Sequence, residues 1–149
     1  MGCSSSLCIA FFLVLSMIPL QAEAAQYEVQ YFEDGSYLVT YILTTEDTLY
    51  SSSKNGSKVN TFHAADGTVV WEVKLTGSFT YNGSSSSCTN ASCSVSHYTS
   101  DWYTISKSSS KSGNTAYGDA TIGEKVLGVT VRKVPVSLSL SCDANGKLS

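Results

Sequence analysis

With 149 residues, the chain is long enough for one domain with a hydrophobic core and too short for two domains of ordinary size. A formal net charge of −3 and a charged fraction of only 14% exclude the strongly basic face of a typical nucleic-acid-binding domain. We therefore expect a single domain without a nucleic-acid partner, whose polar surface consists mainly of Ser, Thr, Asn and Gly.

The N-terminal segment predicts export. The apolar run Leu7–Leu20 is shorter than the roughly 20 residues that span a membrane, and Ala22-Glu23-Ala24 follows it as a small-x-small cleavage motif. We expect a signal peptide at residues 1–24, cleavage between Ala24 and Ala25, and a single β-rich extracellular domain at residues 25–149. The mature protein is accordingly expected to be secreted, without a stable membrane anchor.

The first part of the expected domain shows strand patterns separated by polar turns. Residues Tyr27–Tyr31 alternate apolar and polar side chains, which is the period of a half-buried strand, and Glu33–Ser36 predicts a turn. A second strand is expected at Tyr37–Thr44, in a central position because both of its faces are fairly apolar. The segment Ser51–Lys58 contains an Asn-Gly pair and predicts a polar loop, followed by a short strand at Val59–Ala64.

The clearest alternation in the chain runs from Val69 to Tyr81. We expect a long strand there, with Gly77 as the point where a bulge or bend would divide it. The serine-rich segment Ser84–Ser96 and the low-complexity segment Ser106–Asn114 predict loops, and Tyr98–Ile105 between them predicts another strand. The middle of the domain is thus expected to contain strands joined by long, hydroxyl-rich connections.

Three further strand patterns complete the chain and decide the fold class. They lie at Thr115–Ile122, Val126–Val134 and Val136–Cys142, and Pro135 predicts either a break or a sheet edge between the last two. No window of the expected domain shows a convincing apolar stripe of helical period. About eight strands with polar turns predict an all-β fold, a single antiparallel β-sandwich or a small barrel.

The alternation also predicts the core. Two sets of residues at alternate strand positions are too apolar to remain in water. They are Trp71, Val73, Leu75 and Phe79 in one strand, and Val136, Leu138 and Leu140 in another. We expect both sets to face the same interior, with Ser137 and Ser139 pointing outward.

Three cysteines, Cys88, Cys93 and Cys142, follow the expected signal peptide. An oxidising compartment permits one disulfide, and the local pair Cys88–Cys93 is the first possibility because its members meet most readily. A bridge to Cys142 would stabilise the fold more, by about 4 against about 2 kcal/mol in the chain-entropy estimate, and a buried thiol at Cys142 without any bridge is the third possibility. With His63 and His97 the cysteines match no standard zinc spacing, so neither a metal nor another cofactor is expected.

The sequence contains none of the common catalytic motifs, such as Gly-x-Ser-x-Gly, His-Glu-x-x-His or a phosphate-binding glycine loop. His97, which lies near Asp101, could assist a serine nucleophile. The carboxylates that could supply a pair for glycoside hydrolysis are Glu33, Asp34, Glu46, Asp47 and Glu72. Turn and surface positions explain all of these groups more simply, so we predict no catalytic residue and keep a secreted hydrolase as an alternative.

Four segments carry a resemblance to a known group of proteins. They are Leu75–Gly83, Cys88, Trp102 together with Ile105–Asn114, and the closing run Val136–Ser149. Through these segments, the region from Val69 to Ser149 resembles a group of small exported proteins of Gram-positive, gut-type bacteria. The resemblance implies an exported bacterial protein and brings no active site with it.

The aromatic residues suggest a function for the domain. A row of exposed aromatic rings on a charge-poor strand scaffold provides a stacking surface for sugars or an anchor for a protein partner. The candidates are Tyr27, Tyr31, Tyr37, Tyr41, Trp71, Tyr81, Tyr98, Trp102 and Tyr103. We expect a non-catalytic extracellular module that binds a glycan or a protein. The alternatives are the secreted hydrolase and, without residue-level support, a small secreted toxin.

Overall fold

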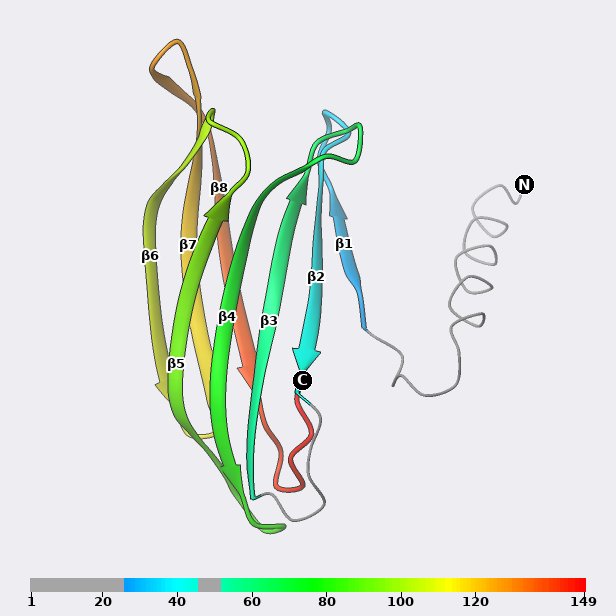
Figure 1. Ribbon diagram of the computed structural model, residues 1–149, viewed down its shortest axis with the longest axis vertical. Coiled ribbons are helices and arrows are strands. Elements are labelled where there is room, and N and C mark those ends of the chain that lie inside the picture. The colour runs from blue at the N-terminus through cyan, green and yellow to red at the C-terminus, as the bar shows by residue number, and fades with distance from the viewer. Residues whose placement is uncertain (1–25, 46–51) are drawn as a thin grey trace, which may run out of the picture.

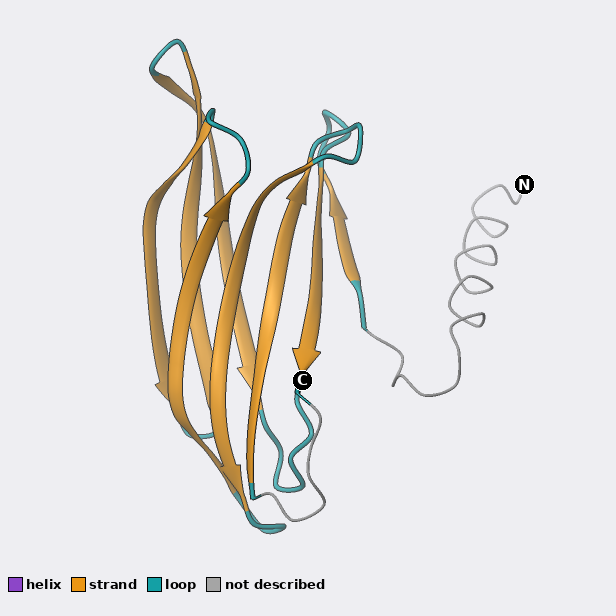
Figure 2. Cartoon of the chain, viewed as in Figure 1, coloured by secondary structure: helices purple, strands orange, loops and turns teal. Residues whose placement is uncertain are grey.

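The computed structural model describes residues 26–45 and 52–149, so the expected signal peptide and its cleavage point at Ala24 and Ala25 lie outside the described residues. This part of the chain consists of strands joined by turns and contains no helix (Figure 2). The strands are β1 (Glu28–Tyr31), β2 (Tyr37–Thr44), β3 (Ser53–His63), β4 (Val69–Tyr81), β5 (Ser86–His97), β6 (Trp102–Ser112), β7 (Thr115–Val126) and β8 (Val129–Ser141). The predicted all-β class is confirmed.

The strands form two antiparallel sheets in which each strand pairs with its neighbours in sequence. The larger sheet has the order β1-β2-β3-β4-β5, and the smaller has the order β6-β7-β8. Figure 1 shows the smaller sheet behind the β3–β5 side of the larger one, where β7 and β8 pack onto β4. At that side the two sheets are also joined, because the backbone N–H of Cys88 in β5 donates to the oxygen of Gly113, 2.8 Å away in the β6–β7 turn. The predicted antiparallel sandwich is confirmed.

The interior between the sheets contains the side chains predicted from the alternation. The buried residues include Trp71, Val73, Leu75 and Phe79 of β4 and Val136, Leu138 and Leu140 of β8. Burial of each of the larger side chains contributes about 1.5–3 kcal/mol. Ser137 and Ser139 are exposed on the opposite face of β8, so the predicted register is confirmed.

An aromatic cluster fills one end of this core. The ring of Trp71 stacks on that of Phe62 with centroids 5.0 Å apart, and the ring of Trp102 lies 6.1 Å from Trp71. The guanidinium group of Arg132 covers the cluster, at 4.8 Å from the ring centroid of Phe32 and 5.2 Å from that of Phe62. Aromatic faces attract a cation through their quadrupoles, so Arg132 closes this end of the core without leaving its charge uncompensated.

Small residues on β7 allow the two sheets to approach closely. A Cβ atom added to Gly118 would lie 3.1 Å from a methyl carbon of Leu75. A Cβ atom added to Gly77 of β4 would lie 3.3 Å from the Cβ atom of Ala116. Leu75 therefore packs against Gly118, and the ring of Phe79 takes the space over Gly77, which gives the close packing that protein interiors require.

Neither Gly77 nor Pro135 divides a strand. β4 continues through Gly77, whose missing side chain leaves room for the ring of Phe79, and the register shift in the pairing with β5 falls just after it, between Ser78 and Phe79. β8 runs from Val129 to Ser141 with Pro135 inside it. A bulge therefore lies next to Gly77, as predicted, but the predicted division of the strand there is wrong. The predicted break at Pro135 is also wrong. The alternative of a sheet edge at Pro135 is confirmed, because β8 is an edge strand and a proline on an edge removes no ladder hydrogen bond.

Three serine-rich segments form strands, and their prediction as loops is wrong. Most of Ser51–Lys58 belongs to β3, most of Ser84–Ser96 to β5, and Ser106–Ser112 to β6. Strand preference depends on what a side chain packs against. Serine costs little on an outward face when the backbone of its strand pairs with a neighbouring strand, as β3 and β5 do with β4 and β6 does with β7. The Asn-Gly pair that predicted a turn lies inside β3, where Leu148 packs directly over Gly56.

The β7–β8 hairpin contains a strained leucine. Leu127 and Gly128 both have positive φ angles, of 50° and 78°. A two-residue turn of this kind favours Asn-Gly, because the left-handed conformation costs an ordinary side chain about 1–2 kcal/mol. Leu127 is also 99% exposed, so it gains no stability from burial.

We expect Leu127→Asn to raise the free energy of unfolding by about 1 kcal/mol in a urea titration, since asparagine tolerates this conformation. Leu127→Val is the matched control and should lower the free energy of unfolding, because a β-branched side chain tolerates a positive φ least. An asparagine variant with an unchanged or lower unfolding midpoint would contradict this account of the turn.

Candidate functional site

The structure places some of the candidate aromatic residues in the core and others on an outer surface. Trp71 and Trp102 are buried between the sheets, which removes them from the candidate binding residues. Tyr81 packs over Gly146, and the hydroxyl group of Tyr103 lies 2.5 Å from that of Thr130. The other five candidate tyrosines gather on the outer face of the larger sheet. We call this surface the tyrosine face, and its members are Tyr27, Tyr31, Tyr37, Tyr41 and Tyr98.

Strand register sets the spacing of the rings. Tyr31 of β1 lies opposite Tyr37 of β2, which lies opposite His63 of β3. The ring centroids of Tyr31 and Tyr37 are 5.4 Å apart, and those of Tyr37 and His63 are 4.7 Å apart. Tyr27 and Tyr41 form a second ring pair at 6.1 Å. Because Tyr41 follows Tyr37 by four residues in one strand, the two aromatic groups lie about 13 Å apart, farther than the length of one hexose ring.

The imidazole of His63 is held in place from several directions. It lies parallel to the ring of Tyr37, with an angle of 2° between the planes. Its Nδ1 atom lies 3.2 Å from the backbone oxygen of Gly67, to which it donates, and its Nε2 atom lies 3.3 Å from Oγ1 of Thr61. A side chain that is already fixed loses little conformational freedom when a ligand binds, so this part of the tyrosine face is preorganised.

An open hollow of about 710 Å³ lies over the tyrosine face. Val39 and Val69 give it apolar lining, and Thr61 and Glu72 add a hydroxyl and a carboxylate. Burial, and after it the negative charge of Glu72, raises the pKa of Tyr41 above its ordinary value. Tyr41 therefore keeps its proton at neutral pH. The hollow thus combines aromatic faces with a hydrogen-bond donor and a charged acceptor.

The sequence indicated the tyrosines of this surface, but it did not associate His63, Thr61 or Glu72 with them. His63, Thr61 and Glu72 reach the hollow because they occupy alternate positions on β3 and β4, on the same side as Tyr37 and Tyr41. The alternation within each strand was visible in the sequence. The sequence did not show which strands are neighbours or in which register they pair. The segment before Val59 was predicted as a loop, so the pairing of β3 with β2 and β4 could not be foreseen.

The structure holds Cys88, Cys93 and Cys142 as thiols, so the predicted Cys88–Cys93 disulfide is not formed in it. The two cysteines lie five residues apart in β5, which at about 3.3 Å per residue separates them by about 16 Å. A disulfide requires Cα atoms within about 7 Å of each other. Burial raises the pKa of both the Cys88 and the Cys93 thiol, so neither is a reactive thiolate at neutral pH. Cys142 is fully buried, and its thiol donates to the backbone oxygen of Asp143.

Two of the groups considered for catalysis, His97 and Asp34, have separate, structural partners. His97 Nε2 lies 2.8 Å from the hydroxyl oxygen of Thr104, and burial lowers the pKa of this histidine. Asp34 accepts hydrogen bonds from Ser36 and from Arg132, which lower the pKa of its carboxyl group. Glu72 lies in the hollow of the tyrosine face, while Glu46 and Asp47 lie outside the described residues. These positions give the hydrolase alternative no support.

Within residues 26–45 and 52–149, no three His, Cys, Asp or Glu side chains are close enough to hold a metal ion. None of the described residues belongs to a helix long and apolar enough to cross a membrane. The sequence matches no protein-family model, and neither a curated protein nor a solved structure is significantly similar to it.

Proposed function

We propose that residues 25–149 form an exported, non-catalytic module that binds extracellular glycans through the tyrosine face. The observation that carries the proposal is the set of tyrosines on one outer face, of which Tyr31 is 72%, Tyr98 58% and Tyr27 52% exposed. Single exposed tyrosines are common, but several exposed aromatic rings on one face mark an interaction surface. Export rests on the pattern of residues 1–24, and a bacterial source rests on the resemblance of Val69–Ser149.

The chemistry of the tyrosine face favours a glycan over a protein partner. Sugar rings present flat C–H faces that stack on aromatic rings, and their hydroxyl groups need nearby donors and acceptors. Tyr37 and Tyr41 supply rings about 13 Å apart along β2, and Thr61, His63 and Glu72 lie between or beside them. The surface is open and carries little charge, whereas a protein interface usually centres on a deeper pocket that excludes water.

We expect the purified protein to bind members of a glycan array and the corresponding polysaccharide in a calorimetric titration. Tyr37→Ala and Tyr41→Ala should each weaken the affinity at least about tenfold, because each removes a stacking ring that anchors the ligand. Tyr37→Phe keeps the ring and should bind within about threefold of the wild type, which separates stacking from hydrogen bonding by the hydroxyl group.

Tyr117→Ala is the matched control, because Tyr117 is an exposed tyrosine on β7 of the smaller sheet. It should bind glycans as the wild type does. Thermal unfolding of every variant would show that the fold is kept. The proposal fails if the array gives no ligand, or if the alanine variants at positions 37 and 41 bind a glycan as tightly as the Tyr117 control does.

A further inference from the structure

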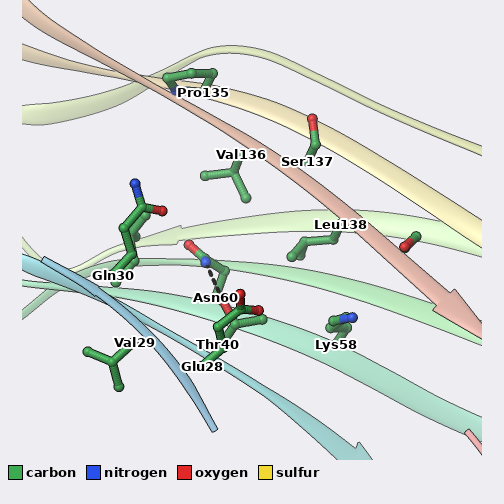
Figure 3. Close-up of a pocket in the computed structure, with 12 residues that line it drawn as sticks. Glu28, Val29, Gln30, Thr40, Lys58, Asn60, Pro135, Val136, Ser137 and Leu138 are labelled. Atoms are coloured by element: carbon green, nitrogen blue, oxygen red, sulfur yellow. Dashed lines mark hydrogen bonds between the residues drawn. The ribbon is translucent and has the colours of Figure 1, made fainter. Parts of the chain in front are cut away.

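The two sheets of the sandwich differ in width, and this leaves part of one inner face without an opposite strand. Five strands of the larger sheet face three of the smaller. β8 packs over β3 and β4, so the inner sides of β1 and β2 extend beyond it (Figure 1). A groove of about 550 Å³ lies here, between β8 on one side and β1, β2 and β3 on the other (Figure 3). It is separate from the tyrosine face, which lies on the outer side of the same strands.

One wall of the groove is the unpaired edge of β8. At the end of this strand, Ser141 exchanges both backbone hydrogen bonds with Ser149, at 2.9 and 3.0 Å, on the side away from β7. Backbone groups alternate between the two sides of a strand with a period of two. The N–H and C=O groups of Ser139 and Ser137 therefore point to the same side as those of Ser141, into the groove. Within the described residues no backbone group pairs with them there.

The floor of the groove contains a buried acceptor without a partner. Asn60 of β3 is only 6% exposed, and its Nδ2 group donates to the hydroxyl oxygen of Thr40 at 2.8 Å. Its Oδ1 atom is buried and has no hydrogen-bond partner among the described residues. Figure 3 shows this amide reaching from β3 towards Val136 of β8. Buried polar atoms are normally hydrogen-bonded, so a donor is missing at this point.

We propose that this groove binds an extended peptide segment of another protein, which adds to β8 as a fourth strand of the smaller sheet. Strand addition of this kind takes its affinity from main-chain hydrogen bonds along an open edge. The added strand would lie about 10 Å from the inner face of β1 and β2, the usual spacing of stacked sheets, and would cover it. The site is independent of the proposed glycan binding.

The lining of the groove defines the peptide. Glu28 and Lys58 at its rim carry opposite charges, so the site favours no net charge on its ligand. Inward-facing residues of the peptide would meet Leu38, which is apolar, and Oδ1 of Asn60, which requires a donor such as a Ser, Thr or Asn side chain. The expected ligand is a neutral strand that alternates small apolar and hydroxyl or amide side chains.

The test selects peptides on the purified protein from a phage-displayed library of random sequences long enough for a strand of about six residues. The dissociation constant of the best synthetic peptide is then measured for three proteins: wild type, Ser137→Pro and Ser137→Ala. Both substitutions remove the hydrogen bond from the Ser137 hydroxyl group to Asp119, which is 2.6 Å long. Only proline also removes the edge N–H, and Pro135 shows that β8 accommodates proline in this alternation.

We expect Ser137→Pro to weaken peptide binding at least about tenfold and Ser137→Ala to change it less than about twofold. In the wild-type protein the amide hydrogens of Ser137 and Ser139 should become protected from exchange when the peptide binds, and this measurement is independent of how well the proline variant folds. Failure to select any peptide, equal binding by the two variants, or unprotected amides would overturn the proposal. A wild-type dimer in sedimentation that Ser137→Pro converts to monomers would also overturn it, in favour of a second copy of this chain.

Discussion

Trp71→Ala is expected to lower the free energy of unfolding by about 3–5 kcal/mol, a large part of the 5–15 kcal/mol that stabilises a typical domain. Trp71 is the largest of the fully buried side chains, and its ring contacts those of Phe62 and Trp102. Its removal loses the transfer free energy of the indole and leaves a cavity that surrounding strands cannot fill. Urea titration followed by circular dichroism measures the effect.

Trp71→Phe separates the loss of packing from the loss of a polar contact, and a pair of variants on β8 tests which side of that strand faces the core. The indole N–H of Trp71 has no hydrogen-bond partner among the described residues, so Trp71→Phe gives up no polar contact and should cost only about 1–2 kcal/mol. On β8, Leu138→Ala should be strongly destabilising, by about 2–5 kcal/mol, while Ser139→Ala should change stability by less than about 0.5 kcal/mol. If Ser139→Ala unfolds the protein and Leu138→Ala does not, β8 is one residue out of phase.

Arg132→Ala is expected to cost about 2–3 kcal/mol, although Arg132 is a charged residue at the margin of the core. Its guanidinium lies over the rings of Phe32, Phe62 and Trp102, at 4.8, 5.2 and 5.9 Å, and donates to the carboxylate of Asp34 at 2.8 Å. The side chain therefore contributes by packing and by cation–π attraction, and the ion pair adds less because Asp34 is exposed.

Two further variants divide this effect into its parts. Arg132→Lys keeps the charge but loses the planar group that stacks on the rings, so it should retain only part of the stability. Asp34→Asn removes the ion pair and leaves the rings covered, so it should destabilise less than Arg132→Ala does. An Asp34→Asn variant as unstable as Arg132→Ala would show that the ion pair, and not the aromatic contact, holds Arg132 in place.

The sequence predicted the strands whose side chains alternate between apolar and polar. In β4 and β8 the apolar residues occupy one face of the strand, and a sandwich buries that face. Residues such as Trp71, Leu75 and Leu138 were therefore enough to predict the fold class, the inward face of each strand and the core. In β5 and β6 the alternation is hidden because serines occupy both faces. Their strand conformation comes from pairing with β4 and β7, which is information about neighbours and not about the segments themselves.

The sequence predicted that tyrosines would form the candidate site, but not which face of the sheet they would occupy. β2 has apolar side chains on both faces, and nothing within Tyr37–Thr44 says which face lies outside. The structure places Leu38 inward and Tyr37 and Tyr41 outward, because the smaller sheet covers the side of β3 and β4 on which Asn60 and Val73 lie. The groove beside β8 was not predictable at all, since it results from the unequal widths of two sheets.

The order of the strands bears on how the chain acquires its structure. Every strand within a sheet pairs with the one before it in sequence, so each can form a hairpin as soon as its two arms have been synthesised. Loop closure over short separations is fast, whereas contacts between distant segments slow folding. The contacts of β3 and β4 with β8 join such distant segments. We therefore expect the two meanders to form early and independently, and their face-to-face docking, which must wait for β8, to limit the folding rate.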